Sequence, residues 1–97
     1  MSAAFAIQHV EESCLFETWR DGHRGVLTYR LDEGAVPPVM TIDHTGVPVV
    51  VRGQGMAAAL VAAAFDVARQ RGWRVQPACS YAAAWAHRHA DATGAMV

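Results

Sequence analysis

The first half of the chain alternates between apolar and polar residues, which is the pattern of half-buried β-strands. Such stretches run over residues 5–9, 14–20, 26–31 and 39–45. An Asp-Gly pair at the start of residues 21–25 predicts a hairpin loop there. Gly34 and two consecutive prolines predict a second loop over residues 32–38. Residues 49–51 are a short apolar run after Gly46 and Pro48, and we expect them to form a further strand segment.

The second half has the period of an α-helix. Residues 54–71 place Met56, Leu60, Ala64 and Val67 on one face, and Gly72 follows in the position of a C-terminal cap. Residues 73–76 predict a short strand, and Ser80 is the expected N-cap of a last helix that ends near residue 89. A strand, a helix and a strand in succession predict a parallel strand pair.

These elements predict an α+β fold in one domain over residues 1–97, with a mainly antiparallel sheet, one parallel pair and two helices. Trp19 and Trp73 are expected to be core residues. The acidic pair at residues 11–12 is expected to be a solvated turn.

Composition excludes several classes of function. The net charge is −1 and no Lys/Arg cluster is present, so nucleic-acid binding is not expected. The longest apolar run, residues 56–65, is about half of what a bilayer span needs, so no membrane role is expected. Only two cysteines, Cys14 and Cys79, are present, which indicates free thiols and a cytoplasmic location. No Cys/His/carboxylate group has zinc spacing, so no metal is expected.

The loop R-G-Q-G-M-A at residues 52–57 carries the strongest functional signal. Two glycines allow a tight turn and a close approach to a ligand, and free N–H groups at the start of the next helix suit a diphosphate. A Walker loop is excluded because the chain has no lysine. The dinucleotide pattern G-x-G-x-x-G/A fits formally, but no carboxylate follows at the tip of the next strand. The acyl-CoA pattern [RQ]-x-x-G-x-[GA] is satisfied by Arg52, Gly55 and Ala57.

Three motifs stand in a consistent order along the chain. They are H-T-x-V-P at residues 44–48, G-x-G-[IM]-A at residues 53–57 and P-x-C-S-Y at residues 77–81. With them the chain resembles the GNAT superfamily of acetyl-CoA-dependent N-acetyltransferases, and within it the short, single-domain YjdJ-like branch. The resemblance implies a minimal GNAT fold and an enzyme that transfers an acetyl group from acetyl-CoA to an amine.

The resemblance also implies where coenzyme A lies. A strand disturbed by Gly46 and Pro48 would splay from its parallel neighbour, and pantetheine would pair with the exposed backbone. Backbone groups of residues 45–47 would face the thioester carbonyl. The expected cofactor-binding residues are Thr45, Val47, Arg52, Gly53, Gln54, Gly55, Met56 and Ala57.

Cys79 and His44 are the candidate catalytic residues. Cys79 is either a nucleophile, an acid for the departing CoA thiolate, or a small packed side chain, and His44 is either a base or a structural histidine. Tyr81 either contacts the ligand or packs its ring, and packing is the favoured expectation. A non-catalytic CoA- or acyl-CoA-binding module remains the alternative function, and a small interaction domain is a third. The amine acceptor and the oligomeric state are left open.

Overall fold

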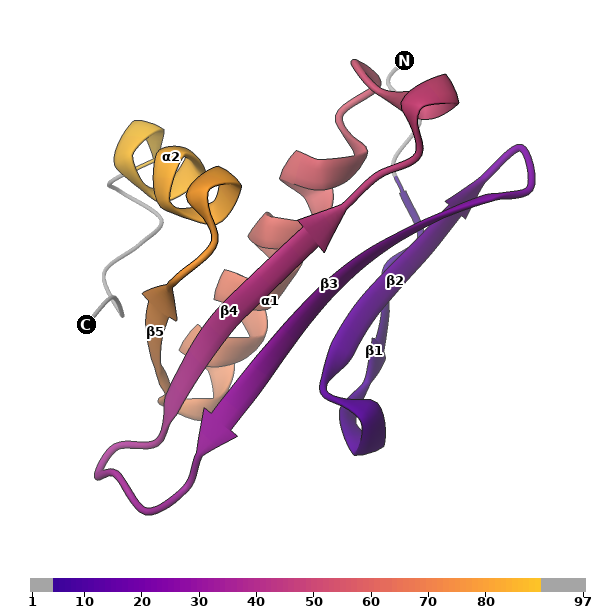
Figure 1. Ribbon diagram of the computed structural model, residues 1–97. Coiled ribbons are helices and arrows are strands. Elements are labelled where there is room, and N and C mark those ends of the chain that lie inside the picture. Colours follow the sequence, from indigo (N-terminus) through magenta and orange to yellow (C-terminus); the bar gives the residue numbers. More distant parts are fainter. Residues whose placement is uncertain (1–4, 90–97) are drawn as a thin grey trace.

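The computed structural model describes residues 5–89 of the chain. Five strands and two α-helices make up this part (Figure 1), joined by turns and two short 3₁₀ helices. The elements are β1 (Gln8–Val10), η1 (Glu11–Ser13), β2 (Leu15–Arg20), β3 (His23–Asp32), β4 (Val39–Gly46), η2 (Val49–Val51), α1 (Met56–Arg71), β5 (Arg74–Pro77) and α2 (Ser80–Arg88).

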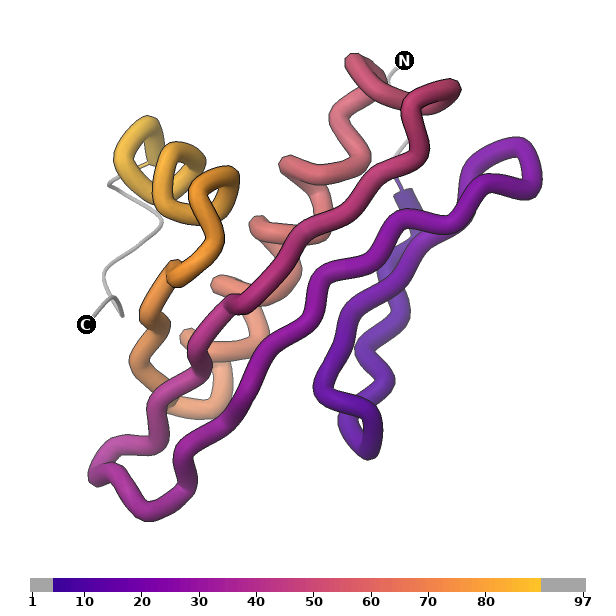
Figure 2. Tube along the Cα trace, in the orientation of Figure 1, coloured from indigo at the N-terminus to yellow at the C-terminus, as the bar shows by residue number. Residues whose placement is uncertain are grey.

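The sheet follows the chain in the order β1-β2-β3-β4-β5. The first four strands are an antiparallel meander, and β5 pairs with β4 in parallel after the α1 crossover. The predicted α+β class with one parallel pair is therefore confirmed. Figure 2 shows the chain leaving β4, turning through η2 at one end of the sheet and running back along α1.

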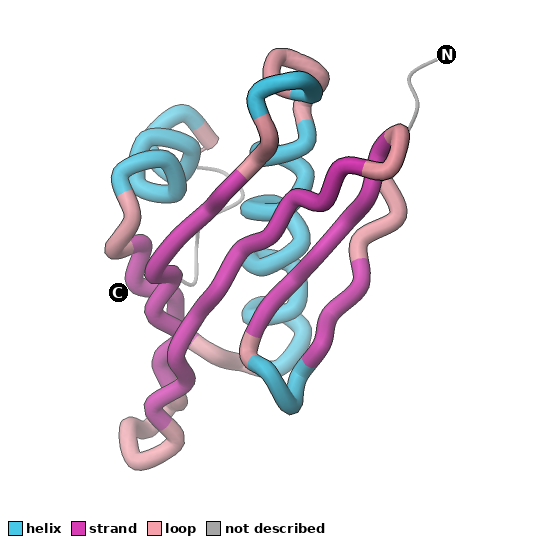
Figure 3. Tube along the Cα trace, turned by 45° about the vertical axis from the view of Figure 1, so that its right-hand side comes forward, coloured by secondary structure: helices cyan, strands magenta, loops and turns pink. Residues whose placement is uncertain are grey.

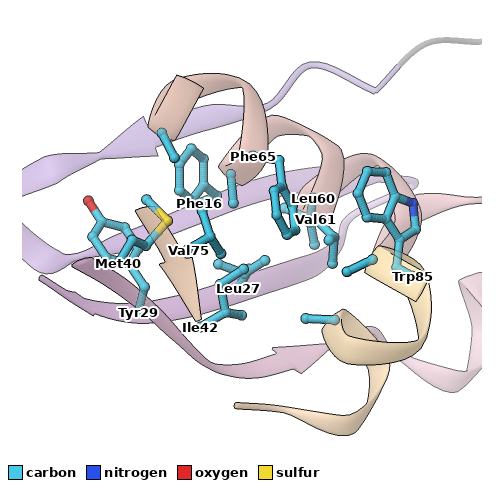
Figure 4. Packing of buried hydrophobic residues seen from close by; sticks show 14 of the residues in the cluster. Phe16, Leu27, Tyr29, Met40, Ile42, Leu60, Val61, Phe65, Val75 and Trp85 are labelled. Carbon is cyan, nitrogen blue, oxygen red and sulfur yellow. The ribbon is translucent and has the colours of Figure 1, made fainter. Parts of the chain in front are cut away.

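The core lies between the sheet and α1. Leu27, Met40, Ile42 and Val75 on the strands are fully buried, as are Leu60, Val61 and Ala64 on α1. α2 completes the core by stacking Trp85 against Phe65 of α1, with ring centroids 5.3 Å apart (Figure 4). The face of β3 that bears Leu27, Tyr29 and Leu31 is the inner face, as the alternation predicts.

The opposite face of the sheet, here called the outer face, is covered by no helix of the described part (Figures 1 and 3). Trp19 lies there with 56% of its surface exposed. Its prediction as a core residue is wrong, because Phe16 and Thr18 occupy the inner face of β2 and strict alternation sends Trp19 outward. Trp73, by contrast, packs against the core.

A bulge in β4 changes the direction of the strands near its end. Tyr29 pairs with Ile42 and Thr28 with His44, so Asp43 is an extra residue with no partner opposite it. Asp43 and His44 are consequently both exposed, although alternation would place them on opposite faces.

The parallel pairing of β4 and β5 ends at the same level. The last paired residues are Ile42 and Pro77, and the next two N–H groups, of Ala78 and Cys79, both donate to the Ile42 carbonyl (3.0 Å each). The two strands therefore separate as expected, but the cause differs from the predicted one. β4 stays paired with β3 through Gly46, and the separation begins at the bulge and at Pro77, which has no N–H to donate.

Three local predictions are wrong. Val49–Val51 is a 3₁₀ helix rather than a strand, because no neighbouring strand reaches it and its first N–H bonds run back to Pro48 and Val49 (3.1 Å each). The first hairpin has a two-residue turn at Asp21 and Gly22, both with positive φ, so β3 begins at His23. The N-cap of α2 is Cys79 instead of Ser80.

At the far end of the sheet, β1 is tied to the rest of the fold by polar contacts. His9 lies 2.6 Å from the Tyr29 hydroxyl and stacks on Phe16. Glu11 and Glu12 are both exposed in the short 3₁₀ helix η1, in keeping with the predicted solvated turn, and Glu11 also forms an ion pair with Arg71 in the last turn of α1. Neither described helix is long and apolar enough to cross a bilayer.

Candidate functional site

A cavity of about 560 Å³ opens where β4 and β5 separate. Its walls come from the end of β4, the loop that leads into α1, the first turn of α1, and the first turn of α2. The residues that line it are His44, Thr45, Gly46, Val47, Val51, Arg52, Gly53, Gly55, Met56, Ala57, Ala58 and Tyr81.

The loop before α1 presents unpaired donors to this cavity. Gly53 and Gly55 adopt φ of 83° and 89°, a left-handed conformation that glycine reaches without strain. Gly55 is the N-cap and offers no side chain, and the first helical bond is donated by Ala59 to the Gly55 carbonyl (3.0 Å). The N–H groups of residues 56–58 therefore have no helical acceptor, and the positive end of the helix dipole faces the cavity.

Arg52 stands at the rim of the same loop. Its guanidinium is exposed and has no ion-pair or hydrogen-bond partner within residues 5–89. A free cation beside free N–H groups makes this corner suited to an anion.

Two residues of the loop motif, Gln54 and Met56, make contacts with strands β2 and β3. The Gln54 side chain accepts a hydrogen bond from Arg20 (3.1 Å) and does not line the cavity. The Met56 side chain is buried, and a Cβ on Gly25 of β3 would lie 2.3 Å from its sulfur. The close approach of this thioether to β3 fixes the start of α1 against the sheet.

His44 lies across Gly46 at the cavity wall. A Cβ at Gly46 would come within 2.8 Å of His44 Nε2, so the imidazole occupies the space that a side chain at position 46 would take. Both residues line the cavity. The imidazole therefore stands beside the backbone of residues 45–47.

Cys79 faces β4 from across the separation of the strands. Its Sγ accepts a hydrogen bond from the Ala82 N–H (3.2 Å) and lies 3.5 Å from Thr45 Oγ1. Cys79 does not itself line the cavity, but Thr45 joins it to the wall.

The structure thus places nearly all predicted site residues around one cavity. Gln54 and Cys79 are not among the lining residues, whereas Tyr81, for which packing was favoured over ligand contact, is one of them. The signal that could have indicated this is that Tyr81 is the last residue of the P-x-C-S-Y motif. No group of three or more metal-binding side chains occurs in the described part of the chain.

The sequence also matches a model of a known protein family. The model of the GCN5-related N-acetyltransferases covers residues 15–95 of this sequence. The chain belongs to this family. The family is one of acetyltransferases, and its general acyl donor is acetyl-CoA.

Solved structures agree with this assignment at the level of the fold. A ribosomal-protein-alanine N-acetyltransferase from Brucella melitensis biovar Abortus 2308 superposes with a TM-score of 0.51 and 20% sequence identity, over 90% of this chain and 68% of that one. No curated protein matches the sequence.

Proposed function

We propose that this protein is an N-acetyltransferase that binds acetyl-CoA in the cavity between β4, α1 and α2. The coincidence of that cavity with the unpaired start of α1 and the separated strands carries the proposal. The diphosphate would lie on residues 52–57, held by the free N–H groups of the loop and helix and by Arg52.

The thioester end would lie between β4 and α2. Beyond Ile42, the edge of β4 that faces β5 has no strand partner, so pantetheine amides can pair with it as a strand would. Backbone N–H groups of residues 45–47 would face the carbonyl oxygen and stabilise the negative charge that develops there.

The reaction follows from this placement. The amine nitrogen attacks the acetyl carbon, the carbon–sulfur bond breaks, and the proton lost by nitrogen ends on the sulfur of CoA. His44 is placed to pass that proton at the cavity wall. Cys79 would either protonate the leaving thiolate through Thr45 or carry the acetyl group between two transfers.

A non-catalytic CoA-binding module is the second candidate. It is favoured by one observation, that among residues 5–89 no carboxylate lines the cavity. An acetyltransferase releases free CoA from acetyl-CoA when a suitable amine is added, whereas a binding module does not.

Thermal unfolding tests whether the coenzyme binds here. Acetyl-CoA at about 100 times its Kd should raise Tm by roughly 10–20 °C, since it binds only the folded state. Ala57→Glu should abolish this shift by placing a carboxylate at the anion corner. Position 57 is in the first turn, where an acidic residue favours the helix, so folding is preserved without the strain that a side chain at Gly55 would add.

Ala57→Gln, of equal size and no charge, is the matched control and should keep most of the shift. A wild-type protein whose Tm does not respond to millimolar acetyl-CoA would rule out both the enzyme and the binding module. An undiminished shift in Ala57→Glu would place the coenzyme elsewhere.

A further inference from the structure

The bulge residue of β4 is tied to β3 by its side chain. Asp43 has no residue opposite it in the β3–β4 ladder. Its two carboxylate oxygens instead accept from Arg30 Nε (3.1 Å each), and Arg30 Nη2 lies 3.0 Å from Asp43 Oδ1. A guanidinium that meets both oxygens of a carboxylate fixes direction as well as distance. At this one residue the ion pair therefore takes the place of the cross-strand bonds that hold the rest of β4.

The bulge decides which backbone groups of β4 face the gap beside β5. The Ile42 carbonyl faces β5, because it accepts from two N–H groups there. The Tyr29 N–H faces β2, because it donates to the carbonyl of the residue before that strand. Ile42 and Tyr29 lie opposite each other, so theirs is a non-hydrogen-bonded pair. Backbone groups alternate in direction along a strand, so those of Thr28 and His44, the next pair, face each other, and those of Thr45 face the gap.

Without the extra residue this direction would be reversed. In a regular strand the backbone of His44 would share the direction of Ile42, whereas the bulge passes that direction to Thr45. The Thr45 side chain lies on the inner face with Leu27, and its Oγ1 is 3.5 Å from Cys79 Sγ. Thr45 is among the residues whose N–H groups are proposed above to face the thioester carbonyl.

The end of β4 beyond the bulge has a short hold on the sheet. Within residues 5–89, three residue pairs follow the bulge in the β3–β4 ladder, the last of them Val26–Gly46. On the other side, the pairing with β5 has already ended at Ile42. A slip of one residue would move every side chain in this stretch to the opposite face. The ion pair at the bulge is therefore placed to keep Thr45 in its orientation.

We propose, building on the function proposed above, that Arg30 and Asp43 are positioning residues for acetyl transfer. Their ion pair holds the bulge in place, and the bulge aims the Thr45 N–H at the thioester carbonyl of the bound coenzyme. Neither of the two charged side chains lines the cavity. Arg30 acts through Asp43, and Asp43 acts through the backbone that follows it.

The stretching frequency of the thioester carbonyl measures this positioning without an amine acceptor. Hydrogen-bond donors that meet the oxygen weaken the C=O bond, so the frequency should be lower in the wild-type complex than in free acetyl-CoA. Asp43→Ala and Arg30→Ala should each lose most of this decrease. Infrared difference spectra of acetyl-CoA with a heavy carbon isotope at the carbonyl provide the measurement.

Combined and matched variants identify the ion pair as the cause. The double variant Arg30→Ala/Asp43→Ala should lose no more of the decrease than either single variant, because each already breaks the same pair. Glu17→Ala is the matched control. It breaks the ion pair with Arg24 (2.7 Å), which also links two strands on the outer face but lies in a ladder without a bulge, and it should change nothing.

The effect of acetyl-CoA on Tm reports whether each variant is folded and binds the coenzyme. Neither Arg30 nor Asp43 belongs to the loop and helix start that would hold the diphosphate, so all variants should keep this increase in Tm. The Arg30 side chain is 73% exposed, and exposed ion pairs add little to global stability. Without ligand, Tm should therefore change little.

Several results would overturn the inference. They are an undiminished decrease in either single variant, an equal loss in Glu17→Ala, a larger loss in the double variant than in the single ones, and loss of the Tm increase in Arg30→Ala. A wild-type complex with no decrease in frequency would also overturn it, because the ion pair would then have no aimed donor to maintain. Failure of acetyl-CoA to change the wild-type Tm overturns the proposed function itself, so the two failures are distinct.

Discussion

At the scale of single residues, Cys79 has a structural and a chemical role that can be separated. Its sulfur caps α2 by accepting the Ala82 N–H, and the same sulfur contacts the Thr45 hydroxyl. Serine retains an oxygen acceptor for the cap, whereas alanine removes it.

We therefore expect Cys79→Ala to lower the free energy of unfolding by about 1 kcal/mol and Cys79→Ser to leave it nearly unchanged. If the thiol takes part in transfer, both variants should lose at least about tenfold in kcat with little change in acetyl-CoA affinity. Urea unfolding and CoA release measure the two effects. Full activity in Cys79→Ser would mean that Cys79 serves only as the N-cap of α2.

His9 gives the fold a pH dependence outside the site. Burial lowers the pKa of His9, against the opposing charge of Glu11, and its ring is 2.6 Å from the Tyr29 hydroxyl. Burial also raises the pKa of Tyr29 to about 12, so this partner is neutral at ordinary pH.

Because the pKa of His9 is lower in the folded state, its neutral form favours folding, and that contribution is complete above the unfolded pKa near 6.5. It should be lost as pH falls through the folded value. We expect Tm to fall between pH 7 and pH 5, and His9→Gln to flatten that slope. Scanning calorimetry measures Tm over this pH range for both proteins. If Tm depends on pH in the same way in both, His9 is not the cause.

At the scale of elements, the position of α1 depends on a close contact with β3. Met56 at the start of the helix lies over Gly25, where a Cβ would come within 2.3 Å of the sulfur and 3.4 Å of Leu60 Cδ1. Gly25 has a negative φ, so the requirement for glycine there is spatial rather than conformational.

Gly25→Ala should destabilise the fold by about 1–3 kcal/mol and weaken acetyl-CoA binding, because the first turn of α1 must shift. Met56→Ala in the same chain should reduce the added cost, since the clashing atoms are gone. A double-mutant cycle in urea measures the coupling. If the changes in the free energy of unfolding simply add, the two residues are not energetically coupled.

At the scale of the molecule, binding and chemistry are assigned to opposite ends of one cavity. The loop and α1 supply the anion corner, while β4 and α2 supply the groups near the thioester. An acyl donor without a diphosphate can reach only the second end.

S-acetyl-N-acetylcysteamine should thus remain a donor with KM raised at least about 100-fold, the equivalent of two charge-assisted hydrogen bonds. The kcat with this donor should differ from that with acetyl-CoA by much less than KM does. Ala57→Glu should leave both constants for this donor unchanged. Steady-state kinetics with both donors provide the measurement. Equal KM values for the two donors would mean that the anion corner contributes nothing.

The sequence by itself determined most of the elements and most of the residues that line the cavity. Period-2 and period-3.6 patterns are local, so the strands, α1 and the glycine loop at residues 52–57 could be predicted from neighbours along the chain. The glycines needed at positions 53 and 55 follow from backbone conformation, which is also local.

Only the tertiary structure decided how these parts meet. The bulge at Asp43 and the exposure of Trp19 depend on which strands pair and which face α1 covers, and those contacts join residues far apart in sequence. A single sequence carries no direct record of such pairings. Most residues that line the cavity could therefore be named in advance, while the cavity itself became visible only when β4, α1 and α2 lay side by side.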